Sequence, residues 1–218
     1  MTQTPARAHK FGRTRLIDPN MQLLLDKIAD VRVGLTLRGA DASRRTIEGG
    51  PHYLRISDLT ESGELHILET HPIDPAQASD RRYHVQSGDI LLANRGTRMT
   101  AALVPENLNA VAGGQLFVVR LKSPEILPEF LHTFLNLQVT QDYLRSHARG
   151  SYVQTLSVAI LRSLPVPILP LETQRKIASL FELAATERRL VDELSRKRAE
   201  LLETSLNRLI SPTRIHSF

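Results

Sequence analysis

The chain has 218 residues, and 41% of them are hydrophobic, which is enough apolar material to bury a core. Its formal net charge is +5, and 23 of its 28 basic residues are arginine, a side chain suited to bidentate contacts with phosphate and guanine. It contains no cysteine, which excludes disulfides and thiolate metal sites. No apolar run approaches the roughly 20 residues of a membrane span, so we expect a soluble, cytoplasmic protein whose basic surface attracts polyanions.

Residues 1–20 are expected to be a flexible basic arm that carries Arg7, Lys10, Arg13 and Arg15. Residues 211–218 form a short tail at the other end of the chain. The residues of the arm and the tail indicate no role for either segment.

Residues 21–170 are expected to fold into a β-rich domain. Short apolar runs alternate there with Gly, Pro, Asn, Asp and Ser, as is typical of strands in an irregular sheet or barrel. Turn signals such as Ser62-Gly63 and Gly113-Gly114 separate several of these runs. The predicted strands are residues 52–56, 64–69, 89–94, 100–104 and 115–121.

One helix is predicted within this domain, over residues 128–148. Pro128 is typical of a first helical position. A stripe at near-helical spacing should pack on the sheet. Its members are Leu131, Phe134, Leu135, Gln138 and Tyr143.

Three prolines, Pro165, Pro167 and Pro170, mark the segment before the last predicted element. Each restricts the preceding residue to extended conformations and lacks an N–H donor, so we expect a stiff final strand or connector that fixes the angle of the last element. Residues 171–210 contain no Gly or Pro and place Glu172 in the first turn, which favours a single long helix. At 1.5 Å per residue, about 40 residues make a rod about 60 Å long.

An apolar seam with roughly heptad spacing runs along this predicted helix and continues to Leu206 and Leu209. Glu187, Arg198 and Ser205 interrupt the seam. A small domain cannot cover a stripe of this length, so we expect a partner helix; a helix folded back on its own domain is the alternative. The predicted interface residues are Ile177, Leu180, Phe181, Ala184, Val191, Leu194 and Leu201.

No complete catalytic motif occurs in the chain. We find no glycine-rich cofactor loop, no Walker A loop, no Asn/Asp-Pro-Pro-aromatic tetrapeptide of adenine methyltransferases and no nuclease-type Glu-x-Lys after a suitably spaced Asp. The eight histidines include no pair at helical metal spacing. Asp89 is better explained as a turn residue before a strand than as a catalytic acid. The sequence therefore predicts a protein that is not an enzyme and that holds no metal or cofactor of its own.

Four motifs precede or overlap the start of the predicted long helix: LLLDKIADVRVG (23–34), GGPHYLRISDLTESGEL (49–65), VQSGDILLANRG (85–96) and GSYVQTLSVAILRSLPVPILPLETQRKIASLF (150–181). Their order resembles that of the specificity subunits of type I restriction-modification systems. In that family a target recognition domain reads DNA, and long helices act as spacers and as docking sites for methyltransferase subunits. The resemblance implies an α+β fold, with a β-rich recognition domain (21–170) that includes a few packed helices, followed by one long C-terminal helix (171–210).

Specificity subunits usually carry two recognition domains and two helices, whereas this chain has room for one of each. The resemblance then implies a half-length subunit that forms a homodimer with antiparallel, coiled-coil-like helices and binds a split, symmetric site in double-stranded DNA. Methyltransferase (M) subunits would bring S-adenosylmethionine and the activity. A restriction/translocase (R) subunit, with ATP, is needed only if restriction also occurs.

Long polar side chains in the loops of the domain are the candidate DNA contacts. Arginine can pair with guanine, Asn and Gln can pair with adenine, and Tyr and Ser more often hold phosphate. For each residue the alternative is a solvated loop position or a local ion pair. The candidates are Arg44, Arg45, Asn94, Arg95, Thr97, Arg98, Arg149, Ser151, Tyr152 and Gln154.

A stand-alone DNA-binding or coiled-coil adaptor protein, for instance in another phage-defence assembly, is the second function that the sequence allows. A neighbouring gene with an Asn-Pro-Pro-aromatic motif and a cofactor loop would favour the methylation system. An isolated gene would favour the adaptor.

Overall fold

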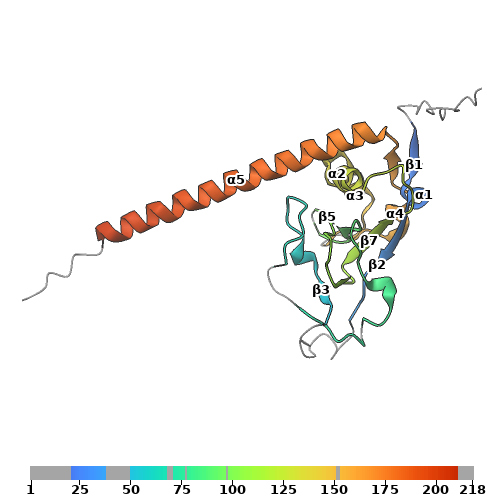
Figure 1. The fold of residues 1–218 in the computed structure, drawn as a ribbon, viewed down its shortest axis with the longest axis horizontal. Coiled ribbons are helices and arrows are strands. Elements are labelled where there is room, and N and C mark those ends of the chain that lie inside the picture. The colour runs from blue at the N-terminus through green and yellow to red at the C-terminus, as the bar shows by residue number, and fades with distance from the viewer. Residues whose placement is uncertain are drawn as a thin grey trace, which may run out of the picture.

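The computed structural model describes residues 21–37, 50–67, 71–76, 78–96, 98–150 and 153–210. These residues form a mixed α+β domain at one end of a long helix, α5 (Leu171–Ile210), which confirms the expected fold class (Figure 1). The predicted basic arm and tail lie outside the described residues. No helix in the described part of the chain is both long enough and apolar enough to cross a membrane.

Four strands form the central sheet, in the order β2 (Ala29–Val33), β7 (Leu116–Leu121), β4 (Ile90–Ala93) and β5 (Ala101–Leu103), and each neighbouring pair is antiparallel. Both faces of this sheet are covered, because all of β4 and the first four residues of β7 are buried. Alternate side chains of β4 enter two separate cores on the two faces. Burial on both faces explains why β4 and the first four residues of β7 are continuous apolar runs.

Two smaller sheets flank the central one. Strand β3 (His52–Leu54) pairs in parallel with β6 (Ala110–Ala112), and β1 (Gln22–Leu24) pairs antiparallel with β8 (Pro165–Pro167). The short helices are α1 (Leu25–Ile28), α2 (Pro128–Asn136), α3 (Gln138–His147) and α4 (Val158–Arg162), with 3₁₀ turns at Ile56–Asp58 and Arg81–Tyr83. Helix α2 contacts both β5 and α5 and so connects the sheet to the long helix.

Four of the five predicted strands are confirmed, since β3, β4, β5 and β7 lie within the predicted ranges. The strand expected at 64–69 does not form in its described part, where Leu65 makes only an isolated bridge to Leu59. The reason is a tight turn: Thr60 Oγ1 accepts a hydrogen bond from the N–H of Glu64 at 3.0 Å, and Gly63 adopts φ +86°. Local side-chain bonding of this kind competes with strand pairing.

The single helix predicted over 128–148 is wrong in one respect, because it is divided at Leu137. Helix α2 ends at Asn136, α3 begins at Gln138, and Leu137 has an extended backbone with φ −62° and ψ 142°. The break leaves few backbone groups unpaired, because the Leu137 N–H donates to Thr133 O at 3.1 Å and the Leu137 carbonyl accepts from Gln141 N at 2.9 Å.

The proline-rich segment forms a final strand, as predicted. Pro165 and Pro167 of β8 lie opposite Leu24 and Gln22 of β1 in a sheet of only two strands. A strand in such a sheet tolerates the missing N–H donors of proline on its unpaired side. The segment therefore leads from the domain into α5 without continuing the sheet.

Gln174, in the first turn of α5, joins this helix to the domain. Its side chain is fully buried. Its Oε1 accepts from the N–H of Leu127 at 2.8 Å, and its Nε2 donates to the carbonyls of Glu125 at 2.7 Å and Leu169 at 2.8 Å. These three bonds connect the start of α5 to the loop before α2 and to the segment after β8, so the direction of the helix is fixed where it leaves the domain.

Contact between α5 and the domain ends near Ala185. Ile177 and Phe181 are partly buried and Ala185 is buried, whereas every residue from 187 to 210 is exposed. The distal part of α5 therefore projects away from the domain as a rod (Figure 1). Its 24 exposed residues (187–210) span about 36 Å at 1.5 Å per residue.

We predict that replacing Gln174 with leucine lowers the free energy of unfolding by about 2–4 kcal/mol, because one N–H and two carbonyls lose their buried partner. Urea unfolding followed by circular dichroism measures this change. Glu172→Gln is the matched control: its partner Lys176 lies 2.8 Å away, but both side chains are more than 70% exposed, so the loss should stay below about 0.5 kcal/mol. Equal losses in both variants would contradict the role assigned to Gln174.

Candidate nucleic-acid interface

Two loops that carry predicted DNA contacts lie side by side, and we call their described residues, 94–96 and 98 in the first and 149–150 and 153–155 in the second, the paired loops. Arg95 and Arg149 each form an antiparallel bridge with Thr155. The first loop follows β4, and the second lies between α3 and α4. The fold therefore brings candidate residues from two distant parts of the sequence to one place.

Further backbone bonds hold the paired loops together. The N–H of Gly96 donates to Gln154 O at 3.0 Å, and the N–H of Leu156 donates to Asn94 O at 2.8 Å. Gly96 has φ +113°, a conformation that residues with a Cβ rarely adopt. Glycine at this position therefore lets the chain turn tightly between two arginines.

The structure describes five of the ten predicted DNA contacts. Arg95, Arg98, Arg149 and Gln154 are exposed, so their side chains are accessible to a ligand. Their DNA-binding role stays a prediction. The candidates that lie outside the described residues are Arg44, Arg45, Thr97, Ser151 and Tyr152.

Asn94, the fifth described candidate, is buried and only 7% exposed. Its side-chain Nδ2 donates to Gly114 O at 3.0 Å, and its backbone N–H donates to Gln115 O at 3.0 Å. These bonds tie the start of the first paired loop to the turn before β7. In this structure the side-chain amide is used to hold the loop rather than presented at the surface.

Asp89 has a structural partner, which fits its interpretation as a turn residue. Its carboxylate accepts from Arg120 Nε at 2.7 Å and Arg120 Nη2 at 2.6 Å, and it also accepts from the N–H of Gln86 at 2.8 Å. The hydrogen bonds that Arg120 donates to Asp89 raise the pKa of the Arg120 guanidinium above its ordinary value. The bidentate pair connects β7 to the turn before β4, at the end of the sheet remote from the paired loops.

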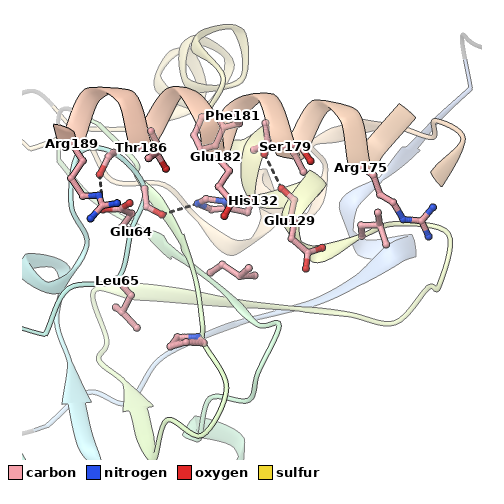
Figure 2. Close-up of a pocket in the computed structure, with 18 residues that line it drawn as sticks. Glu64, Leu65, Glu129, His132, Arg175, Ser179, Phe181, Glu182, Thr186 and Arg189 are labelled. Carbon is pink, nitrogen blue, oxygen red and sulfur yellow. Dashed lines mark hydrogen bonds between the residues drawn. The ribbon is translucent and has the colours of Figure 1, made fainter. Parts of the chain in front are cut away.

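A groove of about 650 Å³ lies where α5 leaves the domain, and its walls are α5, α2 and the turn at residues 62–65. Figure 2 shows α5 above this groove, with Phe181 and His132 close together and Arg175 and Arg189 toward its two ends. The rings of His132 and Phe181 meet edge to face, with centroids 5.5 Å apart.

His132 connects three elements at this groove. Its Nε2 lies 2.8 Å from Gly63 O and 3.2 Å from Ala101 O. Both partners are carbonyl oxygens, so Nε2 carries a proton and donates. Burial lowers the pKa of His132 below its ordinary value of 6.5, so the neutral imidazole is the form that fits the folded protein.

A second groove, of about 640 Å³, adjoins the first and extends along α5. Arg98 lines it together with residues of α5, so the first paired loop faces the helix across this groove. Its charged lining is balanced between basic and acidic side chains, and it does not by itself favour a polyanion. The charged residues are Arg98, Arg188, Arg189 and Arg196, with Glu61, Glu64, Asp192 and Glu193.

The predicted interface residues of α5 fall into two groups. Ile177 and Phe181 are partly buried against the domain, and Ala184 is partly buried as well. Leu180, Val191, Leu194 and Leu201 are 51–68% exposed. The first group contributes to contacts within the chain, and the second remains available to a partner.

The family model described as "Type I restriction modification DNA specificity domain" matches residues 39–194. The match covers most of the β-rich domain and the first half of α5. The chain belongs to this family. No curated protein matches it.

Solved structures of specificity subunits share the fold of this family member. One, from a study of complex assembly and conformational transition in a type I restriction-modification system, has a TM-score of 0.57 at 18% identity, over 91% of this chain and 46% of that one. The specificity subunit of M. genitalium has a TM-score of 0.53 at 18% identity, over 93% and 49%. The HsdS subunit of Thermoanaerobacter tengcongensis has a TM-score of 0.53 at 18% identity, over 91% of this chain and 45% of that one. The chain thus spans about half the length of these subunits.

Several residues that matter to this specificity domain were not predicted from the sequence. Leu183 and Leu190 are 67% and 55% exposed and extend the free apolar stripe of α5. Leu183 lies three residues after Leu180, and Leu190 lies four residues before Leu194, so helical spacing was the available signal for both. Gln174, within the motif at residues 150–181, is another such residue. Its three partners could not be inferred from spacing along the chain.

We predict that the protein loses stability as the pH falls below about 6.5, and that His132 contributes to this loss. A histidine whose pKa is lower in the folded state binds its proton preferentially in the unfolded state, so acid favours unfolding. The His132→Gln variant should therefore lose less in melting temperature between pH 7 and pH 5 than the wild type loses. His66→Gln, which changes an exposed histidine near the same turn, should keep the wild-type pH dependence. A wild-type pH dependence in His132→Gln would contradict the assignment.

Proposed function

We propose that this chain is a non-catalytic DNA specificity subunit of a type I-like restriction-modification system, in which it selects the sequence that partner subunits methylate. The observation that carries the proposal is the pairing of two arginine-bearing loops within a domain of the specificity family. Arg95, Arg98 and Arg149 are exposed there and can reach phosphates or guanine edges.

The second part of the proposal is a homodimer. The chain spans about half the length of the specificity subunits that share its fold, and its apolar stripe on α5 lies beyond the reach of its own domain. A second copy with an antiparallel helix would cover the stripe on both chains. Such a twofold dimer presents two equivalent DNA-reading domains, so its target would be a split and symmetric sequence.

The length of α5 supports a separated pair of half-sites. Its 40 residues span about 60 Å, whereas one turn of B-DNA advances about 34–36 Å. Two domains held at opposite ends of antiparallel helices would then contact DNA more than one helical turn apart. The base pairs between the two half-sites would be spanned without being read.

Partner subunits complete the proposed system. Methyltransferase subunits would dock on this chain and bring S-adenosylmethionine, because the sequence has no cofactor loop and no methyltransferase tetrapeptide. A restriction subunit is required only if cleavage accompanies methylation. The proposed site of action is chromosomal and invading DNA in the cytoplasm.

We predict that Arg95→Ala and Arg98→Ala weaken binding to the preferred DNA sequence more than binding to a mixed-sequence duplex. A guanine contact contributes about 1–3 kcal/mol of discrimination, whereas a phosphate contact contributes equally on every sequence. Selection from a random duplex library identifies the preferred sequence, and titrations at one fixed salt concentration give both affinities. Arg55→Ala, an exposed arginine outside the paired loops, is the control. Unchanged binding in both loop variants would remove the paired loops from the DNA site.

We also predict that Leu194→Glu converts the dimer into a monomer, because it places a charge in the middle of the apolar stripe. Sedimentation velocity of the full chain measures the change. Arg196→Glu is the matched control, because two residues of helix place position 196 about 200° around the axis, on the opposite face. A wild-type chain that sediments as a monomer, alone and with its methyltransferase partner, would contradict the homodimer.

A further inference from the structure

At the β5 edge of the central sheet, side chains rather than another strand pair with the backbone. Strand β5 is the last strand of that sheet, and β4 pairs with only one of its sides. Ala93 N–H donates to Thr100 O at 2.9 Å, so the backbone groups of the adjacent residues, Met99 and Ala101, point away from β4. Both residues are fully buried, and these groups need partners other than water.

Two buried side-chain amides supply those partners. Gln141 accepts from the Met99 N–H at 3.1 Å and donates to the Met99 carbonyl at 2.9 Å. Asn136 accepts from the Ala101 N–H at 3.1 Å and donates to the Ala101 carbonyl at 2.9 Å. Each amide thus pairs with a backbone residue as a neighbouring strand would, and both are at most 4% exposed.

The break between α2 and α3 makes this arrangement possible. In one continuous helix, residues five positions apart point about 140° away from each other, since each residue turns the helix by about 100°. Asn136 and Gln141 could not then face the same strand edge. The extended backbone of Leu137 redirects the chain so that Asn136 reaches Ala101 in β5 and Gln141 reaches Met99 just before it.

The backbone groups of Ala101 and Met99 differ in whether they have a hydrogen-bond partner besides the amide. The Ala101 carbonyl has a second donor, His132 Nε2, at 3.2 Å. Within the described residues, the backbone groups of Met99 bond only to Gln141. Met99 also directly follows Arg98, so Gln141 holds the end of the first paired loop while Asn94 holds its beginning.

We propose that Gln141 is a positioning residue for the loop that carries Arg95 and Arg98, and that the selectivity of this loop for a DNA sequence depends on it. The inference rests on the proposed function. A base contact requires the guanidinium in one place and one orientation, whereas a phosphate contact tolerates many. Freeing Met99 from Gln141 allows the loop more conformations and so weakens base contacts selectively.

The test compares Gln141→Met with Asn136→Leu in the full-length chain. Each variant removes one amide and replaces it with an apolar side chain of similar size, so both should lower the melting temperature. DNA selected by the wild type from a random 60-bp duplex library is the specific probe, and a mixed-sequence duplex of equal length is the non-specific probe. The readout is the ratio of the two affinities at one salt concentration.

Gln141→Met should lower this ratio about tenfold, within the range expected for losing one well-placed base contact, and leave non-specific binding within about twofold, because phosphate contacts dominate it. Asn136→Leu should keep the wild-type ratio. Amide hydrogen exchange of residues 95–98 in the free protein should become faster in Gln141→Met alone.

Two results would overturn the inference while the proposed function stands: a wild-type ratio in Gln141→Met, or an equal loss in Asn136→Leu. A wild-type protein that selects no sequence from the library would instead contradict the proposed function, and the inference with it.

Discussion

The buried amide of Gln174 sets the geometry on which the proposed function depends. Its three hydrogen bonds tie the first turn of α5 to the loop before α2 and to the end of the proline segment. Apolar contacts such as those of Ile177 and Phe181 would remain without them, and these fix a direction less strictly than hydrogen bonds do. A subunit that measures the distance between two half-sites needs a defined angle at this junction, because an error there is amplified along a rod of about 60 Å.

Buried side-chain amides also pair with backbone groups around the first paired loop and at the edge of the central sheet. Asn94 bonds the turn before β7, Gln141 bonds Met99, and Asn136 bonds Ala101. In each case a side-chain amide serves backbone groups that no regular helix or strand satisfies, as buried polar groups require. The domain thus has irregular loops beside a regular sheet, and hydrogen bonds from side-chain amides hold these loops in place. Under the proposed function, loops held in this way would present their arginines to DNA without a change of backbone conformation.

The sequence predicted those elements that depend on local patterns. The absence of Gly and Pro over residues 171–210 defined α5, and apolar runs bounded by turn residues located β3, β4, β5 and β7. It failed where a contact between distant residues decides the local structure. Leu137 lies in a stretch with good helical spacing, and its extended conformation serves amides that bond residues 35 and 42 positions away. The burial of Asn94 could not be predicted for the same reason, since its partner Gly114 is 20 residues distant.

The central claim, that this chain selects the sequence a partner methylates, is tested most directly by sequencing N6-methyladenine in host DNA with and without the gene. The account predicts a methylated motif of two inverted half-sites, separated by unread base pairs, that disappears when the gene is deleted and returns when it is restored. Identical methylation in both strains would contradict the account. A dependent but undivided, asymmetric motif would contradict the dimer of two reading domains.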